Sequence, residues 1–274
     1  MANDRGSQRA PAACPHQASA DYLPASRVTA CVRGGISVYD VRDVIDASAS
    51  GIPEDAAVAM REVARWIEGF VNRPHPALGR TGEVCPWTRR TADLGRLLIA
   101  PIASDDAAEV DAIVLALLER FWSMEPTGGA DAGFRSIIGV LHRLNPETAA
   151  AFVVAAHTRL KPTFLDRGLM LGEFYPTCTK PGLRNPSFRP LASPVPLLVI
   201  RQMVEADVEF LLDRDEFVDA YLRTHRSRGA ERLVRVLEQR PASVTSERVP
   251  GLLRLAAAYR DSLRPPRSSP RPTA

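Results

Sequence analysis

Apolar residues recur at every third or fourth position along much of the chain, which is the spacing of one face of an α-helix. The clearest stripe comprises Val110, Val114, Leu117 and Phe121. It follows Ser104–Asp106, where a capping side chain and acidic residues favour the start of a helix. The same pattern predicts further helices over residues 54–72, 131–144, 146–166 and 210–225, and one or two more within 230–262.

Shorter apolar runs predict strands over residues 96–102, 169–175 and 195–203. The run Leu197–Ile200 has no polar interruption, which is typical of a strand covered on both faces. Helices outnumber strands and do not alternate with them regularly. We therefore predict an α+β fold, a helix-dominated single domain with one small mixed sheet. The loop over residues 176–196, rich in proline, is long for a compact domain, and such loops are usually functional or mobile.

The two ends of the chain differ in composition from its middle. Residues 1–50 are rich in alanine, serine, arginine and glycine, so we predict that they are mostly disordered. One apolar alternation, residues 36–44, predicts a weak strand or helix that joins the core. We expect the core domain over 54–225, a helical extension over 226–263 and a disordered basic tail over 264–274.

Charge is distributed unevenly along the chain. Its net charge is +3, but the residues from Arg226 onward carry eleven arginines and four acids, or +7, which leaves −4 for residues 1–225. The core therefore lacks the basic face that nucleic-acid binding needs. The basic tail has two interpretations: it is simply solvated, or it contacts polyanions weakly. Arginine outnumbers lysine 33 to 2, which we attribute to G+C-rich coding DNA of the kind that actinobacteria have.

The sequence lacks the patterns of exported and membrane proteins. The N-terminal residues contain no apolar stretch of the signal-peptide kind, and no apolar run is long enough to span a bilayer, so we predict a cytoplasmic protein without a membrane partner. The four cysteines are widely spaced, as free thiols are: Cys14, Cys31, Cys85 and Cys178. Oligomeric state is left open. Signatures of α/β-hydrolases, zincins, P-loop NTPases and dinucleotide enzymes are absent.

Residues 74–87, with the sequence PHPALGRTGEVCPW, hold the densest collection of reactive side chains. An imidazole (His75), a guanidinium (Arg80), a thiol (Cys85) and an indole (Trp87) lie within thirteen positions. The residue before a proline avoids helical geometry, so Cys85 can present its sulfur to a pocket as a haem ligand or a nucleophile. The alternative is a buried cysteine beside a proline turn, with the tryptophan filling the core.

Two further segments carry candidate binding groups. Glu173 interrupts an apolar strand, and a buried carboxylate is costly unless it is paired, so we expect a cation from Arg80, Arg189 or Arg201. Such a pair is either structural or part of a ligand site. Tyr175 ends the strand, where its hydroxyl can bind a ligand or reach solvent. Arg189 and Arg201 flank a proline-rich stretch in positions that suit capture of a carboxylate, although surface arginines explain them too.

Three segments together resemble a known family. They are residues 74–87, residues 168–176 (GLMLGEFYP) and residues 185–201 (NPSFRPLASPVPLLVIR). Their order and spacing resemble the bacterial domain of unknown function 6875 over roughly residues 55–225. The layout also resembles, more distantly, the YqcI/YcgG family, some members of which are haem-dependent oxygenases that act on amine nitrogens. The chain departs from the first family's pattern at two positions, since that family usually has Phe where this chain has Trp87 and His where it has Tyr175.

The resemblance implies a haem-dependent oxidative enzyme that acts on a small amine or amino acid, with Cys85 or Tyr175 as iron ligand. One alternative is a non-catalytic domain that binds a small molecule or a partner. Another is a transferase that uses Cys85 as nucleophile and His75 as base. We assign Trp87 to cofactor binding, and to substrate binding Arg80, Glu173, Arg189 and Arg201. All these residues except Arg201 are expected to converge on one pocket.

Overall fold

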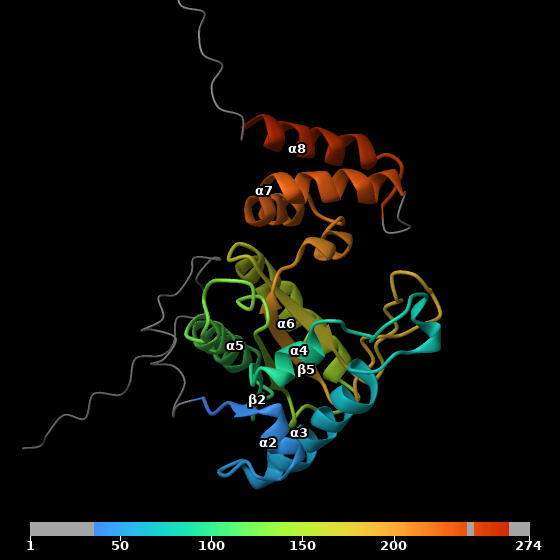
Figure 1. Ribbon diagram of the computed structural model, residues 1–274. Helices are drawn as coiled ribbons and strands as arrows, with labels where there is room; N and C mark the ends of the chain where they lie inside the picture. The colour runs from blue at the N-terminus through green and yellow to red at the C-terminus, as the bar shows by residue number, and fades with distance from the viewer. Residues whose placement is uncertain (1–35, 240–243, 263–274) are drawn as a thin grey trace, which may run out of the picture.

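One five-stranded sheet organises the fold (Figure 1). The computed structural model describes residues 36–239 and 244–262, so the disorder predicted for 264–274 and for most of 1–50 falls outside the described residues. In spatial order the strands are β1 (Tyr39–Asp40), β2 (Leu97–Pro101), β3 (Ser136–Val140), β5 (Leu197–Gln202) and β4 (Leu169–Phe174). β2 and β3 run parallel, and every other neighbouring pair is antiparallel. The predicted α+β class with a small mixed sheet is confirmed.

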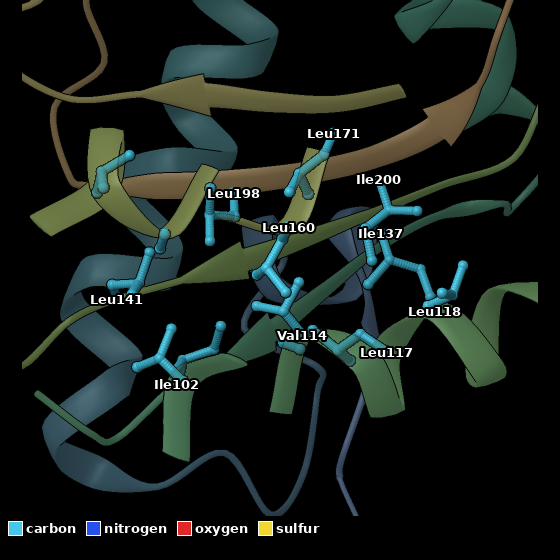
Figure 2. Close-up of a cluster of buried hydrophobic side chains, with 14 of the residues drawn as sticks. Ile102, Val114, Leu117, Leu118, Ile137, Leu141, Leu160, Leu171, Leu198 and Ile200 are labelled. Carbon is cyan, nitrogen blue, oxygen red and sulfur yellow. The ribbon is translucent and has the colours of Figure 1, made fainter. Parts of the chain in front are cut away.

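Helices α5 (Ala107–Trp122) and α6 (Ala149–Leu165) cover one face of the sheet. Asp106 starts α5 by accepting a hydrogen bond from the Glu109 N–H at 2.8 Å, and Gly168 follows the end of α6 with φ +69°. Figure 2 shows the cluster of side chains between these layers, with Val114 and Leu117 of α5 facing Ile137 of β3. Burial of this apolar surface is the main contribution to the stability of the domain.

The opposite face of the sheet packs against the N-terminal helices. These are α2 (Val41–Ile45), α3 (Glu54–Trp66) and the π-helical segment η1 (Ile67–Val71) that continues α3. Met60, Val63 and Ile67 of the predicted first helix are buried there, as the helical spacing requires. A short helix, α4 (Thr88–Asp93), follows the 74–87 segment, which itself contains a 3₁₀ turn, η2 (Pro76–Leu78).

A third layer of helices lies beyond one end of the sheet. It contains η3 (Glu205–Phe210), α7 (Asp215–Glu238) and α8 (Val249–Ser262), and Figure 1 shows α7 and α8 stacked on each other. The helical geometry of α7 is interrupted at Arg226, with φ 54° and ψ −133°, one residue after the predicted end of the last core helix. No helix within the described ranges is long and apolar enough to cross a membrane.

Two predicted elements differ from the structure. The helix expected over 131–144 is instead strand β3, and all five of its residues are buried. Its apolar residues cover both faces of a central strand, and a short apolar run of this kind has no periodicity that separates a strand from a helix. The helix expected from residue 210 begins at Asp215, since residues 205–210 form a 3₁₀ helix and a turn separates it from α7.

Candidate functional site

The loop that contains residues 74–87 packs against the start of the segment 185–201. The ring of His75 stacks on that of Phe188, with centroids 4.7 Å apart, and Asn185 donates a hydrogen bond to the Ala77 carbonyl at 2.9 Å. Gly79 permits this approach, because it has φ +74° and a Cβ there would lie 2.9 Å from the Cβ of Arg184. Figure 1 shows the two loops side by side, extending away from the sheet.

In these two loops, the side chains predicted to bind a ligand form hydrogen bonds with the backbone. Arg80 donates to the carbonyls of Thr81 and Val84 at 2.9 and 3.1 Å, and Arg189 donates to those of Pro186 and Phe188. The Nδ1 atom of His75 accepts the Ala77 N–H at 3.2 Å, which starts η2. With Nδ1 so engaged and the ring stacked, the geometry does not favour His75 as a base for Cys85.

Cys85 and Arg201 lie on the face of the sheet that packs against α3. The thiol is half-buried beside the apolar cluster of that face. Arg201 forms a two-pronged ion pair with Asp207, with N–O distances of 2.7 and 2.6 Å. Burial opposes the charge of Arg201, but the Asp207 carboxylate outweighs it and raises the pKa of the guanidinium. Arg201 therefore has a partner in the protein, which weakens its assignment to substrate binding.

Glu173 is buried on the opposite face, and its partner is not one of the arginines named above. The carboxylate is 4% exposed, and its Oε1 atom pairs with Lys180 and lies 3.3 Å from Nδ1 of His157. The prediction that Glu173 needs a cation is confirmed, and the prediction of an arginine is wrong. Lys180 reaches it because the chain turns back directly after β4, so a residue seven positions on can lie over the strand end.

The second carboxylate oxygen of Glu173 makes this position unusual. Oε2 is buried and has no hydrogen-bond partner among the described residues. An unpaired buried acceptor costs about 1–3 kcal/mol, and more when it is charged. Glu173 lines a cavity of about 280 Å³ between α6 and the start of α7. The Glu173 carboxylate and its partners His157 and Lys180 all form part of the wall of this cavity.

His157 fixes the hydrogen-bonding character of the same cavity. Its Nε2 lies 3.0 Å from the Leu171 carbonyl, which can only accept, so Nε2 carries the proton. Burial lowers the pKa of His157 to about 4, although the Glu173 charge opposes the shift. The neutral ring then turns the lone pair of Nδ1 toward Glu173. Both groups accept hydrogen bonds, so a donor or a cation satisfies them together.

Lys161 and Lys180 both line this cavity. They are the only two lysines in a chain with 33 arginines. Burial lowers the pKa of Lys161, whose ammonium lies 4.8 Å from the centre of the Phe217 ring. A compact ammonium and a planar guanidinium bind ligands with different geometry, so replacing either lysine by arginine changes the hydrogen-bonding geometry of the cavity wall.

The predicted single pocket is wrong. Trp87, 36% exposed, lines a different cavity from Glu173, and Cys85 packs on the α3 face of the sheet. Side chains alternate between the two faces of a strand, so Glu173 lies on the same face as Leu169 and Leu171, beneath α5 and α6. The sheet thus separates Cys85 from Glu173.

In a comparison with protein-family models, residues 60–235 match the domain of unknown function DUF6875. The chain belongs to this family. No curated protein and no solved structure matched it in two further comparisons. The family's description assigns no activity. The more distant resemblance to the YqcI/YcgG family stays a prediction.

The residues predicted to ligate haem in this DUF6875 protein do not fit that role. Tyr175 is buried, and neither it nor Cys85 lines either cavity. Burial raises the pKa of Tyr175 to about 12, and a hydrogen bond with Cys178 adds to the shift, so the phenolate that binds iron is disfavoured. Within the described residues, no cluster of three or more His, Cys, Asp or Glu side chains is arranged to hold a metal ion.

Of the nine residues that line the cavity beside α6, only Glu173 was among the predicted site residues, and the missed residues include His157, Lys161 and Lys180. His157 and Lys161 are four positions apart on α6, which places them on one helix face. That spacing, together with the scarcity of lysine, was readable in the sequence. The proximity of α6 to Glu173 depends on the packing of the helix on the sheet, which the sequence does not show.

Proposed function

We propose that this DUF6875 protein binds a small zwitterion, an amine that also carries a carboxylate, in the cavity between α6 and β4. The observation that carries the proposal is the buried, unpartnered Oε2 of Glu173, which lines a cavity shared with both lysines of the chain. Of the functions considered from the sequence, the small-molecule-binding domain has the most support from this geometry. The oxidative enzyme and the Cys85-dependent transferase stay predictions.

The amine of the ligand binds at the acceptor side of the cavity. Glu173 supplies Oε2, a carboxylate oxygen without a protein donor among the described residues, and His157 supplies the lone pair of Nδ1, which lies 3.3 Å from the other oxygen of the same carboxylate, Oε1. An ammonium has three donors on one atom, so it can satisfy both acceptors together. Hydrogen bonds to charged groups contribute about 1.5–3 kcal/mol each, which is enough to select amines over uncharged ligands.

The carboxylate of the ligand binds at the cationic side. Lys161, Lys180 and Arg214 line the cavity, but Lys180 pairs with Glu173 and Arg214 pairs with Glu216, so Lys161 is the lining cation without an ion pair among the described residues. A ligand carboxylate compensates the remaining positive charge. The volume of about 280 Å³ lies at the lower end of the range for ligand pockets, so an amino-acid-sized molecule fits better than a larger metabolite.

Isothermal titration calorimetry of the full chain tests the proposal. The ligands are the common α-amino acids, each with a matched amine lacking the carboxylate and a matched acid lacking the amine. We expect at least one amino acid to bind at least tenfold more tightly than either matched compound, because each charged contact is worth more than the 1.4 kcal/mol that tenfold represents. The proposal is wrong if no amino acid binds below about 10 mM, or if the matched compounds bind equally well.

Three variants locate the site. Glu173→Gln keeps the size of the side chain and removes its charge, so the affinity should fall by about tenfold or more. Lys161→Arg and Lys180→Arg keep the charge and change its geometry, so they should also weaken binding. Glu62→Gln, on the exposed surface of α3, is the control and should bind like the wild type. Equal binding by Glu173→Gln and Glu62→Gln would place the ligand elsewhere.

A further inference from the structure

A second cavity, of about 630 Å³, separates the third helical layer from the end of the sheet. Trp87 lines it from the sheet side, and Arg228, Arg232 and Arg235 line it from α7. The three arginines are four and then three positions apart, so they project from one face of the helix. This cavity shares no lining residue with the Glu173 cavity, and none of the zwitterion contacts proposed above involves it.

The arginines are only partly compensated by the protein. Arg228 is 79% exposed and meets Glu205 at 3.3 Å, an ion pair that contributes little at such exposure. Arg232 pairs with Glu209 at 3.1 Å, but its Nε is buried without a partner within the described residues. The guanidinium of Arg235 has no hydrogen bond or ion pair to any described side chain or backbone group. An oxyanion with several acceptor oxygens can engage the remaining donors at once.

The other side of the cavity is aromatic. Trp87 is exposed over 36% of its surface and lines the cavity, so its indole is accessible to a ligand there. His225 borders the cavity and has a buried Nε2 with no partner among the described groups. Burial lowers the pKa of His225, so the ring is neutral and offers a hydrogen bond without adding charge. These groups suit a planar ring with polar edges.

We propose that this cavity binds a phosphomonoester carried on a planar ring, of about the size of a nucleoside monophosphate. The phosphate contacts the arginines of α7 and the ring stacks on Trp87. Phosphate is favoured over a single carboxylate because it brings a charge near −2 and three acceptor oxygens to a cavity lined by three guanidiniums and one carboxylate, Glu205. The volume leaves room for both the ring and the sugar between them.

The test is binding of adenosine monophosphate to the full chain, measured by calorimetry and by tryptophan fluorescence. Adenosine, which lacks the phosphate, and inorganic phosphate, which lacks the nucleoside, serve as matched probes. We expect the monophosphate to bind at least tenfold more tightly than either probe and to quench fluorescence. Affinity should fall as salt concentration rises, because the phosphate contacts are partly exposed. Equal binding of inorganic phosphate would show an unspecific anion site and overturn the proposal, as would absence of saturable binding by the monophosphate.

Arg235→Gln and Trp87→Leu separate the two halves of the site. Arg235 is exposed and unpaired, so its replacement should leave the melting temperature unchanged while lowering monophosphate affinity about tenfold. Trp87→Leu should abolish the quenching of fluorescence and weaken the binding of the monophosphate, but it should not change the binding of inorganic phosphate. The control is Arg254→Gln on the exposed surface of α8, which removes the same charge outside the cavity. Equal losses in Arg254→Gln and Arg235→Gln would mean that net charge alone attracts the ligand, and the proposed site would be wrong.

Discussion

Replacing Asp207 with alanine should destabilise the protein more than any comparable change to a surface ion pair. The Asp207 side chain is 3% exposed. It accepts a bidentate pair of hydrogen bonds from the Arg201 guanidinium and a further hydrogen bond from the Val204 N–H at 2.7 Å. Removing one partner of a buried pair costs about 3–5 kcal/mol, because the other charge stays buried without compensation. Arg201 is 33% exposed, so water can solvate part of it, and we expect about 3 kcal/mol.

Urea denaturation and thermal melting measure this cost. A loss of about 3 kcal/mol corresponds to a fall in melting temperature of about 6–12 °C for a domain of this size. The matched control is Asp111→Ala, since Asp111 forms an equally two-pronged pair with Arg159 at 2.8 and 2.9 Å but on the surface. That variant should lose less than about 1 kcal/mol.

A double variant tests the cause of the loss. Arg201→Met in the Asp207→Ala background removes the uncompensated guanidinium, so it should recover part of the stability lost in the single variant. Equal destabilisation by Asp207→Ala and Asp111→Ala, or a double variant that is less stable than Asp207→Ala alone, would refute the reasoning. In either case the pair would contribute through its packing or its contact with the Val204 N–H rather than through compensation of charge.

Three further predictions concern stability. His157 has a pKa of about 4 when folded and an ordinary value near 6.5 when unfolded, so the unfolded chain binds more protons between these values. Stability is therefore lost as pH falls from about 6.5 toward 4, by about 2 kcal/mol at pH 5, and His157→Gln should flatten this part of a stability–pH curve; an unchanged slope would contradict the shift. Asp106→Ala removes the N-cap of α5 and should cost about 1 kcal/mol in urea denaturation; a value near zero would show that the cap is dispensable. Gly79→Ala forces a side chain into a positive φ and against Arg184, so it should cost about 1–3 kcal/mol and speed proteolysis of the two loops, whereas Gly128→Ala, with open space around it, should not.

Fold elements with a strong local signal could be predicted from the sequence. The run Leu197–Ile200 forms a central strand, and Gly168 follows the end of α6 with the positive φ that glycine allows. The strand β3 could not be told from a helix, because Ile137 and Ile138 are buried on opposite faces, and the local pattern of such a strand has no period.

The candidate site was predictable only in part. The burial of Glu173 in an apolar strand predicted a cationic partner, and the structure contains one. That the partner is Lys180 depends on how the chain turns back after β4, and no local sequence pattern predicts that turn. The separation of Cys85 from Glu173 follows from strand alternation once β4 is placed in the sheet. The sequence did not reveal which helices cover which face.

The position of β4 at the edge of the sheet has a consequence for self-association. Edge strands can pair with another copy of the chain, and proteins limit this with inward-pointing charges or by occupying the free backbone groups. β4 carries both devices, since Glu173 is a buried charge and His157 occupies the Leu171 carbonyl. At the other edge, β1 is only two residues long. Variants that enlarge the α6 cavity by replacing His157 or Glu173 therefore also remove a safeguard against aggregation, and solubility has to be followed alongside ligand affinity in any redesign of the cavity.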